Sequence, residues 1–441
     1  MSKFDELRSQ HPLFIYHDFE LKESSLRFHF SIDEFHFYPE WTFDSFLNSS
    51  DLPREQIEII AFSLGMAELV SYWKCACCPT VEIRCGGLSE WQISWWKKLY
   101  WNGLGEFFYR NGIHTTFEDF LTIKAPAPKP VKEITRELSG TLVPVGGGKD
   151  SVVTLELLKS MGEDITPYII NARGATLGCV EAAGIATEKA VTPRRTIDKT
   201  LLERNAAGWL NGHTPFSAVV AFSALFFGSL KGVRYIALSN ESSANETYVE
   251  GAEINHQYSK STEFERDFRE YCERSFGNTP EYFSLLRPLS EWQIAREFVK
   301  YPQYFGVFQS CNLGSKTDSW CCNCAKCLYV YILLAAFLDD ETLYGIFGCD
   351  MLEKTELTES FDGLVLDGED KPFECVGTKD EVRLSLQMAL KRRSEDPPAL
   401  LRRFAEQFPN YRPVDLDNYF DKDNFVPERF ISLMEKVAHE H

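Results

Sequence analysis

The feature that most constrains the fold is a run of three glycines between an apolar strand and an apolar helix. Residues 140–145 predict the strand, residues 146–148 are the glycines, and residues 152–161 predict the helix. Glycines let the backbone turn sharply and approach an anion closely, and a helix that starts at Ser151 adds the positive end of its dipole. This segment therefore predicts a phosphate-binding loop. The competing interpretation is a plain strand-to-helix turn that Asp150 and Ser151 cap.

The three residues after the glycines suit phosphate binding. Lys149 can neutralise phosphate charge, Asp150 can hold a magnesium ion, and Ser151 can donate a hydrogen bond. The spacing matches neither the Walker A loop, Gly-x-x-x-x-Gly-Lys-[Ser/Thr], nor the dinucleotide pattern Gly-x-Gly-x-x-Gly. We therefore expect this loop to bind phosphate in a different way from those two motifs.

Strands and helices alternate after the glycine loop. A second strand is predicted at 165–170, an apolar helix follows at 215–230, and a third strand is predicted at 233–239. Strands that alternate with helices are typical of a parallel sheet covered on both faces. We therefore expect an α/β fold with a doubly wound parallel sheet.

Composition divides the chain into four segments. Residues 1–125 are rich in tryptophan and combine predicted strands with a helix from 53 to 73, and residues 126–137 form a stiff, proline-rich linker. Residues 138–338 carry the glycine loop and a cysteine cluster, and residues 339–441 are more polar and include predicted helices. We expect an α+β domain, a linker, a nucleotide-binding domain and a mainly helical extension that can complete the active site.

The charge balance disfavours nucleic acid as a partner. The 441 residues include 46 basic and 65 acidic side chains, a net charge of −19, and a chain this acidic repels a phosphate backbone. The apolar stretches fall short of the roughly 20 residues of a membrane span, and the first residues lack an apolar signal sequence. The thirteen cysteines are an odd number, and without an export signal they are expected to be reduced thiols in the cytoplasm. We therefore expect a cytoplasmic protein with no nucleic-acid or membrane partner.

A cysteine cluster after residue 310 has the spacing of a metal site. Two-residue gaps separate Cys321, Cys324 and Cys327, and Cys311 can supply a fourth thiolate. Four thiolates suit tetrahedral zinc, and an iron–sulfur cluster is the alternative occupant. A buried helix start that keeps its thiols is the alternative without a metal. An earlier group has poor spacing for one tetrahedral site, so we expect ordinary thiols at Cys75, Cys77, Cys78 and Cys85.

Three polar segments downstream of the loop carry further candidate side chains. The first contains Ser239 and Glu241 directly after the third strand, where ligands bind in open α/β sheets. The second, at 254–261, is dense in hydrogen-bonding groups, and the third runs from 370 to 378. A polar turn or a plain loop is the alternative interpretation of each. The candidates for acid–base chemistry in the second and third segments are His256, Lys260, Glu374 and Cys375.

The glycine loop resembles the PP-loop of the ATP-pyrophosphatase superfamily, Ser-Gly-Gly-x-Asp-Ser, with Gly146 in the serine position. Members of that superfamily cleave ATP between the α and β phosphates and leave AMP on a substrate oxygen. The resemblance implies a PP-loop fold for the α/β domain, with ATP and Mg²⁺ as cofactors. It also implies that Asn171 and Gly146 border the nucleotide, and the position of Ser239 after the third strand predicts that it does too. The residues that it places on the pyrophosphate are Gly147, Gly148, Lys149, Asp150 and Ser151.

Taken in order, the loop and the later segments resemble one family, the UDP-N-acetylmuramoyl-L-alanyl-L-glutamate epimerases of peptidoglycan synthesis. The resemblance implies an ATP-dependent epimerase whose substrate is a UDP-linked muramoyl dipeptide. The superfamily's cyano-deazaguanine synthases carry a similar late cysteine quartet, which favours structural zinc. The matching segments are 146–151, 239–241, 255–260, 320–327 and 371–377. The catalytic candidates are then Lys149, Asp150, Glu241, His256, Lys260, Glu374 and Cys375.

The implied mechanism explains epimerisation without pyridoxal phosphate. Adenylation turns the glutamyl carboxylate into a mixed anhydride, so that the α-hydrogen can be removed and returned on the opposite face. Two other functions stay open, namely another adenylating enzyme, such as an amide ligase or a deazaguanine-type synthase, and an ATP-binding module without turnover. Four arginines are candidates for the UDP phosphates, although each also suits an ordinary surface charge: Arg173, Arg194, Arg195 and Arg204.

Overall fold

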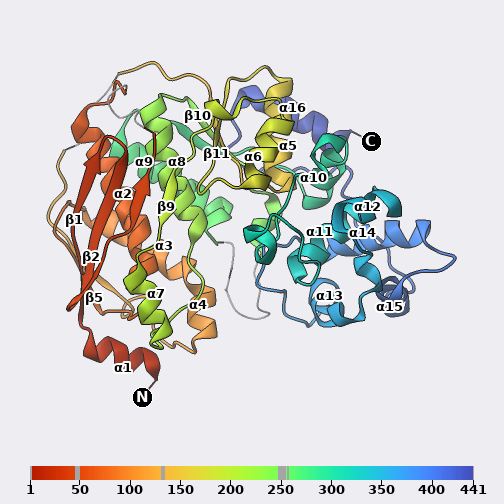
Figure 1. Cartoon of the computed structure of the whole chain (residues 1–441), viewed down its shortest axis with the longest axis horizontal. Helices are drawn as coiled ribbons and strands as arrows, with labels where there is room; N and C mark the ends of the chain where they lie inside the picture. The colour runs from red at the N-terminus through yellow and green to blue at the C-terminus, as the bar shows by residue number, and fades with distance from the viewer. Residues whose placement is uncertain (1, 45–49, 131–134, 247–254, 256–257, 441) are drawn as a thin grey trace.

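Two β-sheets organise the structure, a computed structural model described here for residues 2–44, 50–130, 135–246, 255 and 258–440 (Figure 1). A seven-stranded mixed sheet lies at one end of the molecule, and a four-stranded parallel sheet lies nearer the middle. Helices of the C-terminal third gather at the other end (Figure 1).

The mixed sheet has the strand order β6-β5-β1-β2-β4-β9, with β3 paired to β2. β1 pairs antiparallel with β2 and parallel with β5. Its inner side chains are almost all aromatic or aliphatic, and they pack on α2 (Arg54–Trp73), the helix predicted from 53 to 73. Its strands are β1 (Leu13–Lys22), β2 (Ser25–Ile32), β3 (Phe35–Phe37), β4 (Glu40–Thr42), β5 (Thr80–Ile83), β6 (Thr122–Lys124) and β9 (Arg194–Thr196).

The parallel sheet has the order β11-β10-β7-β8, and all its pairings are parallel. Successive residues of β10 enter different cores, since Ile236 and Leu238 join one and Tyr235 and Ala237 join the other. The sheet is therefore covered on both faces, and the prediction of a mixed α/β fold with a parallel sheet is confirmed. The strands are β7 (Thr141–Pro144), β8 (Ile165–Tyr168), β10 (Tyr235–Leu238) and β11 (Glu281–Ser284).

The helix after the glycine loop starts earlier than predicted. α5 (Lys149–Ser160) begins at Lys149, because Gly148 has the extended backbone of an N-cap, with φ −89° and ψ 171°. The expected start at Ser151 was therefore wrong by two residues. As a result, Lys149, Asp150 and Ser151 form the first turn, and the positive end of the helix lies directly at the glycines.

The remaining helices pack on the two sheets and on one another. Those of the N-terminal part are α1 (Lys3–Gln10), α3 (Glu90–Gly103), α4 (Gly105–Arg110), α6 (Gly174–Ala182), α7 (Lys199–Ala206), α8 (Phe216–Lys231) and α9 (Thr262–Phe276). Those that follow are α10 (Glu291–Phe298), α11 (Ala325–Ala335), α12 (Asp340–Phe347), α13 (Thr358–Val365), α14 (Lys379–Arg392), α15 (Ala399–Gln407) and α16 (Glu428–His439). Among the helices in the described ranges, none combines the length and apolarity that crossing a bilayer requires.

The edge strand β9 of the mixed sheet comes from the part of the chain that follows the proline-rich linker. Trp41 of β4 pairs with Arg195 of β9, and the Arg195 guanidinium donates to both carboxylate oxygens of Glu68 at 2.6 and 2.7 Å. The Trp41 indole donates to the same buried carboxylate at 2.9 Å. The division of the chain at residue 125 stays a prediction, but these contacts tie the segments on its two sides together.

Candidate active site

Three consecutive glycine N–H groups form the centre of the candidate site. Before them, the Val145 N–H still belongs to the sheet, because it donates to Tyr168 O at 2.8 Å. Within the described part of the chain, by contrast, the N–H groups of Gly146, Gly147 and Gly148 donate no hydrogen bond. Unpaired N–H groups at the positive end of a helix are an anion-binding arrangement.

The loop is held from both sides by neighbouring backbone. Gly147 has φ +86°, a left-handed conformation that glycine adopts without strain, and its carbonyl accepts from Gln309 N at 2.6 Å. A Cβ at Gly148 would lie 3.2 Å from Ser310 Cβ, whereas a Cβ at Gly146 would meet no atom within 4 Å. The glycine that departs from the superfamily pattern is thus the one whose surroundings leave room for a side chain.

A buried lysine beside the loop joins two carboxylates. The Lys149 ammonium donates to Asp150 Oδ1 and to Glu291 Oε2. The side chains of Lys149 and Glu291 are 4% and 3% exposed, while that of Asp150 is 28% exposed. Asp150 is therefore the carboxylate of this group that solvent, or an ion from solvent, can reach.

The two carboxylates that share Lys149 have pKa values shifted in opposite directions from their usual values. Burial raises the pKa of Glu291 to about 8, and the charges of Asp150 and Glu241 add to this shift against the opposing effect of Lys149. Burial also disfavours ionised Asp150, but the charges of Lys149 and Lys326 outweigh it and lower the pKa of Asp150. At neutral pH the negative charge therefore rests mainly on Asp150, and Glu291 is mainly the protonated partner.

A second lysine pairs with a thiol from the C-terminal segment. Lys260 Nζ lies 3.2 Å from Cys375 Sγ, and Lys326 Nζ donates to the Cys375 carbonyl. Burial opposes the charge of Lys260, but the neighbouring Cys375, Glu241 and Asp150 raise its pKa above the usual value. Three lysines, three carboxylates and one thiol thus form a single charged cluster beside the loop.

Buried polar side chains fix the backbone of this cluster. Arg287 is fully buried and donates to the carbonyls of Glu241 and Lys260, and its guanidinium also donates to Glu265 at 3.1 Å. Glu381 of α14 accepts from the Glu291 N–H at 2.7 Å. The C-terminal segment therefore contributes both Cys375 and the support for Glu291.

The other predicted residues have defined positions, with one exception. Ser239 follows β10 directly, and its buried hydroxyl has no hydrogen-bond partner within the described residues. Asn171 Oδ1 accepts from Arg195 N at 2.8 Å, and Glu374 accepts from the Asn312 amide at 3.0 Å. His256 lies outside the described residues. Ser151 Oγ donates to Gly148 O at 3.0 Å.

The parallel sheet explains why these segments meet. The carboxyl ends of parallel strands lie at one edge, and each of the four strands leads to a part of the site. β7 leads to the glycine loop, β8 to Asn171, β10 to Ser239 and Glu241, and β11 to Arg287 and Glu291.

Sequence reasoning missed Arg287, Glu291 and Lys326. Arg287 and Glu291 follow β11, a strand that was not predicted, and their local signal is the capping box in which Ser290 and Gln293 start α10. Lys326 had a clearer signal, because it stands between two predicted metal ligands at the start of a helix.

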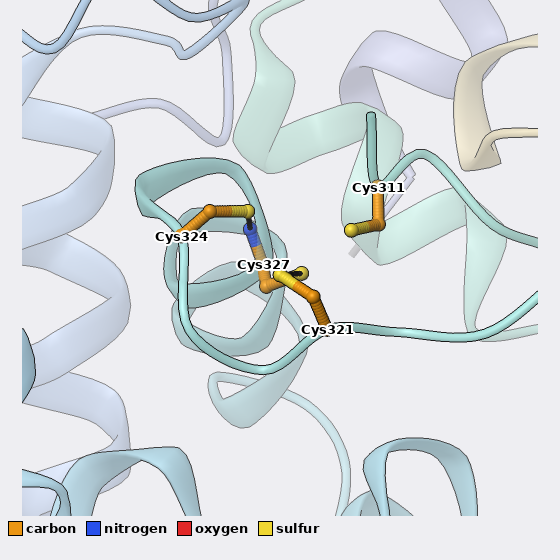
Figure 2. A group of neighbouring side chains, drawn as sticks. All are labelled: Cys311, Cys321, Cys324 and Cys327. Carbon is orange, nitrogen blue, oxygen red and sulfur yellow. Dashed lines mark hydrogen bonds between the residues drawn. The ribbon is translucent and has the colours of Figure 1, made fainter. Parts of the chain in front are cut away.

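The four predicted ligands of the cysteine cluster come together (Figure 2). Their sulfur atoms lie within 4.8 Å of one another, and Cys321 Sγ and Cys327 Sγ are 3.6 Å apart. A tetrahedral zinc site with Zn–S bonds of about 2.3 Å needs sulfur separations of about 3.8 Å. Backbone N–H groups donate to two of the sulfurs, from Gly314 to Cys311 at 3.2 Å and from Cys327 to Cys324 at 3.5 Å. The donor set therefore fits a tetrahedral, thiolate-bound metal.

The remaining cysteines and arginines make other contacts. No disulfide joins any of the thirteen cysteines, all of which lie in the described ranges. Burial raises the pKa of Cys78 to about 12, so its thiol is a neutral core group. Arg195 is committed to Glu68, and the Arg204 guanidinium stacks on the Phe35 ring. Arg173 contacts the glycine loop, because its Nη2 donates to the Gly146 carbonyl at 3.4 Å.

A cavity of about 720 Å³ lies in a different part of the structure. Aromatic side chains of the N-terminal part and of α9 line it, among them Phe62, Trp91 and Tyr271. None of the residues of the glycine loop or of the charged cluster is part of its lining, so we do not place the phosphate site there.

Comparison with known proteins gives consistent matches over most of the chain. The MurL N-terminal domain matches residues 5–285, and the MurL C-terminal domain matches residues 307–418. A UDP-N-acetyl-alpha-D-muramoyl-L-alanyl-L-glutamate epimerase from Xanthomonas oryzae pv. oryzae is 34% identical over 356 residues, 79% of this chain and 78% of its own. Relatives with the same name from Micromonospora sp. and Salinispora tropica are 37% and 36% identical over 72% of this chain, and over 72% and 70% of their own.

The parallel sheet, the glycine loop and the polar groups beyond its strands define the class of α/β proteins that bind ligands at the carboxyl edge of a sheet. The family matches narrow this class. The chain belongs to the MurL family, and it is an enzyme, an epimerase.

Proposed function

We propose that this protein is an ATP-dependent epimerase that converts the terminal L-Glu of UDP-MurNAc-L-Ala-L-Glu to D-Glu. The relatives that carry the name of this activity support the substrate and the reaction. The observation that carries the ATP dependence is the glycine loop, with three consecutive unpaired N–H groups, among the described residues, at the N-terminus of α5. Such a set of donors suits a polyphosphate.

The residues at the loop fit ATP and a magnesium ion. In this proposal the N–H groups of residues 146–148 hold the phosphates, and the unpartnered buried hydroxyl of Ser239 is a donor or acceptor for the nucleotide. Asp150 is ionised and partly exposed, and a carboxylate oxygen is the ligand that Mg²⁺ prefers. Magnesium bound there would neutralise phosphate charge, and Lys149 would add a second positive charge.

Adenylation is proposed because an ionised carboxylate opposes the removal of a proton from the adjacent carbon. An oxygen of the glutamyl α-carboxylate attacks the α phosphorus of ATP, the bond to the bridging oxygen breaks, and pyrophosphate leaves with its electron pair. The carboxyl group is then a mixed anhydride without its negative charge. After inversion, water cleaves the anhydride, which restores the carboxylate and releases AMP.

Inversion needs one group to take the α-proton and another to deliver a proton to the opposite face. We assign one face to Cys375, because Lys260 lies 3.2 Å from its sulfur and an adjacent ammonium favours a thiolate. The second group comes from the other candidates, Glu241, His256 and Glu374. A buried position for Glu241 and a contact of Glu374 with Asn312 support their inclusion.

We further propose that the cysteine cluster binds structural zinc. Cys311 lies in the segment that contacts the loop, since Gln309 donates to Gly147 O, and Cys327 follows Lys326, which contacts Cys375. Zinc would therefore join two segments that both touch the site. Four cysteine ligands leave no open position for catalysis by the metal.

Pyrophosphate release tests this function. With ATP, Mg²⁺ and UDP-MurNAc-L-Ala-L-Glu, we expect pyrophosphate and the D-glutamyl product, and Asp150→Ala should abolish both. Asp164→Ala is the matched control, because its side chain is 81% exposed and lies after α5 rather than at the loop. Pyrophosphate without D-glutamyl product would favour another adenylating enzyme. An absence of pyrophosphate with every carboxylate would favour an ATP-binding module, and D-glutamyl product without ATP would refute the ATP dependence.

A further inference from the structure

Three histidines gather on the outer face of the mixed sheet, far along the chain from the glycine loop. His17 lies in β1, His29 in β2 and His36 in β3. One ring nitrogen of each lies within 4.8 Å of the others. β1 and β2 lie at the left side of the molecule in Figure 1, opposite the helices of the C-terminal third.

A β-bulge between β1 and β2 adds a carboxylate beside the histidines. The pairing of β1 with β2 passes from Tyr16 opposite Phe30 to Asp18 opposite His29, so His17 is the extra residue. Both His17 and Asp18 therefore contact His29, with the His17 and His29 rings stacked at a centroid distance of 4.3 Å. In a regular strand, neighbouring residues point to opposite faces. The register up to Tyr16 already brings His17 to His29, and the bulge is what turns Asp18 to the same face, since bulges often re-aim a side chain.

Polar neighbours orient the histidine rings. Asp18 Oδ2 lies 3.3 Å from His29 Nδ1, and the Ser31 hydroxyl lies 2.8 Å from His17 Nε2. His29 Nε2 lies 2.8 Å from His36 Nδ1, so these two nitrogens already face each other. A carboxylate on the second ring nitrogen is the usual outer partner of a metal-bound histidine, because it fixes the tautomer and raises the basicity of the ligand.

We propose that His17, His29 and His36 bind a divalent transition metal, with zinc as the ion that we commit to. Zinc bonds imidazole nitrogen at about 2.0–2.1 Å, which puts the nitrogens of a tetrahedral site about 3.3 Å apart. Ligand atoms within 4.8 Å reach that separation through small side-chain rotations. Imidazole ligands favour zinc, copper or nickel over magnesium or calcium.

The site differs in kind from the cysteine cluster. His36 is exposed and the other two rings are partly buried, so an ion can enter from solvent. Three protein ligands leave a fourth position for water or an anion, which is the pattern of an open zinc site. Binding there would join β1, β2 and β3, and it does not depend on the proposed epimerase function.

Zinc binding to the full chain tests the proposal. By isothermal titration calorimetry, the wild-type protein should take up one more zinc ion than His29→Ala, and Asp18→Asn should weaken that site about 10–100-fold. His11→Ala is the control, because His11 contacts Asp33 rather than the cluster, and it should bind like the wild type. Equal zinc stoichiometry and affinity in the wild type and His29→Ala would overturn the proposal.

A second measurement needs no variant. Diethyl pyrocarbonate modifies accessible histidines, and peptide mass spectrometry locates the products. Zinc should protect His17, His29 and His36 in the wild-type protein, while the modification of His11 stays unchanged. Equal modification of the three cluster histidines with and without zinc would also overturn the proposal.

Discussion

The turn at Gly147 allows a quantitative test of the phosphate loop. Gly147 has φ +86°, and a Cβ built there lies 3.4 Å from its nearest neighbours, Ala175 and Thr176, which is ordinary contact. The penalty of Gly147→Ala is therefore backbone strain rather than a collision, about 1–2 kcal/mol for an L-residue in this conformation. Gly146 needs no left-handed backbone and has open space at its Cβ, so Gly146→Ala is a control in the adjacent position.

This strain should appear in the use of ATP. If phosphate binding requires the loop in this conformation, 1–2 kcal/mol lowers kcat/KM for ATP about 5–30-fold in Gly147→Ala. Gly146→Ala should stay within about twofold of the wild type. Initial rates of pyrophosphate release at subsaturating ATP measure both, and calorimetric Tm values show whether either variant is unfolded. The reasoning is refuted if Gly147→Ala keeps the wild-type kcat/KM while Gly146→Ala loses it.

Three further predictions concern the charged cluster and the cysteines. Because burial raises the pKa of Glu291 from 4.5 to about 8, the folded state binds more protons than the unfolded state between these values, and stability should fall as pH rises through this range. Glu291→Gln should flatten this part of a denaturation–pH profile, and an unchanged slope would contradict the assignment. Cys324→Ser should remove bound zinc, measured by mass spectrometry of metals, whereas the control Cys322→Ser should keep it, because that thiol donates to Phe347 O; equal metal content in both would exclude the site. Cys375→Ala should slow exchange of the glutamyl α-proton about 10²–10⁴-fold and keep pyrophosphate release, and unchanged exchange would rule the thiol out.

The glycine loop and three strands of the parallel sheet were predictable because their signals are local. An apolar strand, three glycines and an apolar helix are adjacent in the chain, so the pattern of residues 140–161 was sufficient. The exact start of α5 was not, because it follows from the extended N-cap backbone of Gly148, which the residue pattern does not specify. The quartet of cysteines was also predictable, since three of the four lie within one turn and helix start.

The charged cluster was only partly predictable because its members are far apart in sequence. Lys149 and Glu291 are separated by 142 positions, and Lys260 and Cys375 by 115. Local polarity marked Lys260 and Cys375 as candidates, whereas the capping box beside Glu291 indicates only the start of a helix and no role for this glutamate. Its role follows from burial against Lys149, which only the packing of α10 beside α5 creates.

The mixed sheet shows a similar limit. β9 has only three residues and lies beyond the linker. The sequence therefore has no apolar alternation there that is long enough to predict a strand or its pairing with β4. Likewise, the bulge that places Asp18 opposite His29 depends on the register between two strands. Tertiary pairing decides both features.

Deuterium incorporation tests the central claim most directly. The protein is incubated with ATP, Mg²⁺ and UDP-MurNAc-L-Ala-L-Glu in deuterium oxide, and the glutamyl α-carbon is analysed for deuterium and chirality alongside pyrophosphate. We predict D-glutamyl product with one deuterium at the α-carbon and one pyrophosphate per inversion. D-glutamyl product that retains its α-hydrogen, or deuterium that enters without any release of pyrophosphate, would contradict inversion through an adenylated carboxylate.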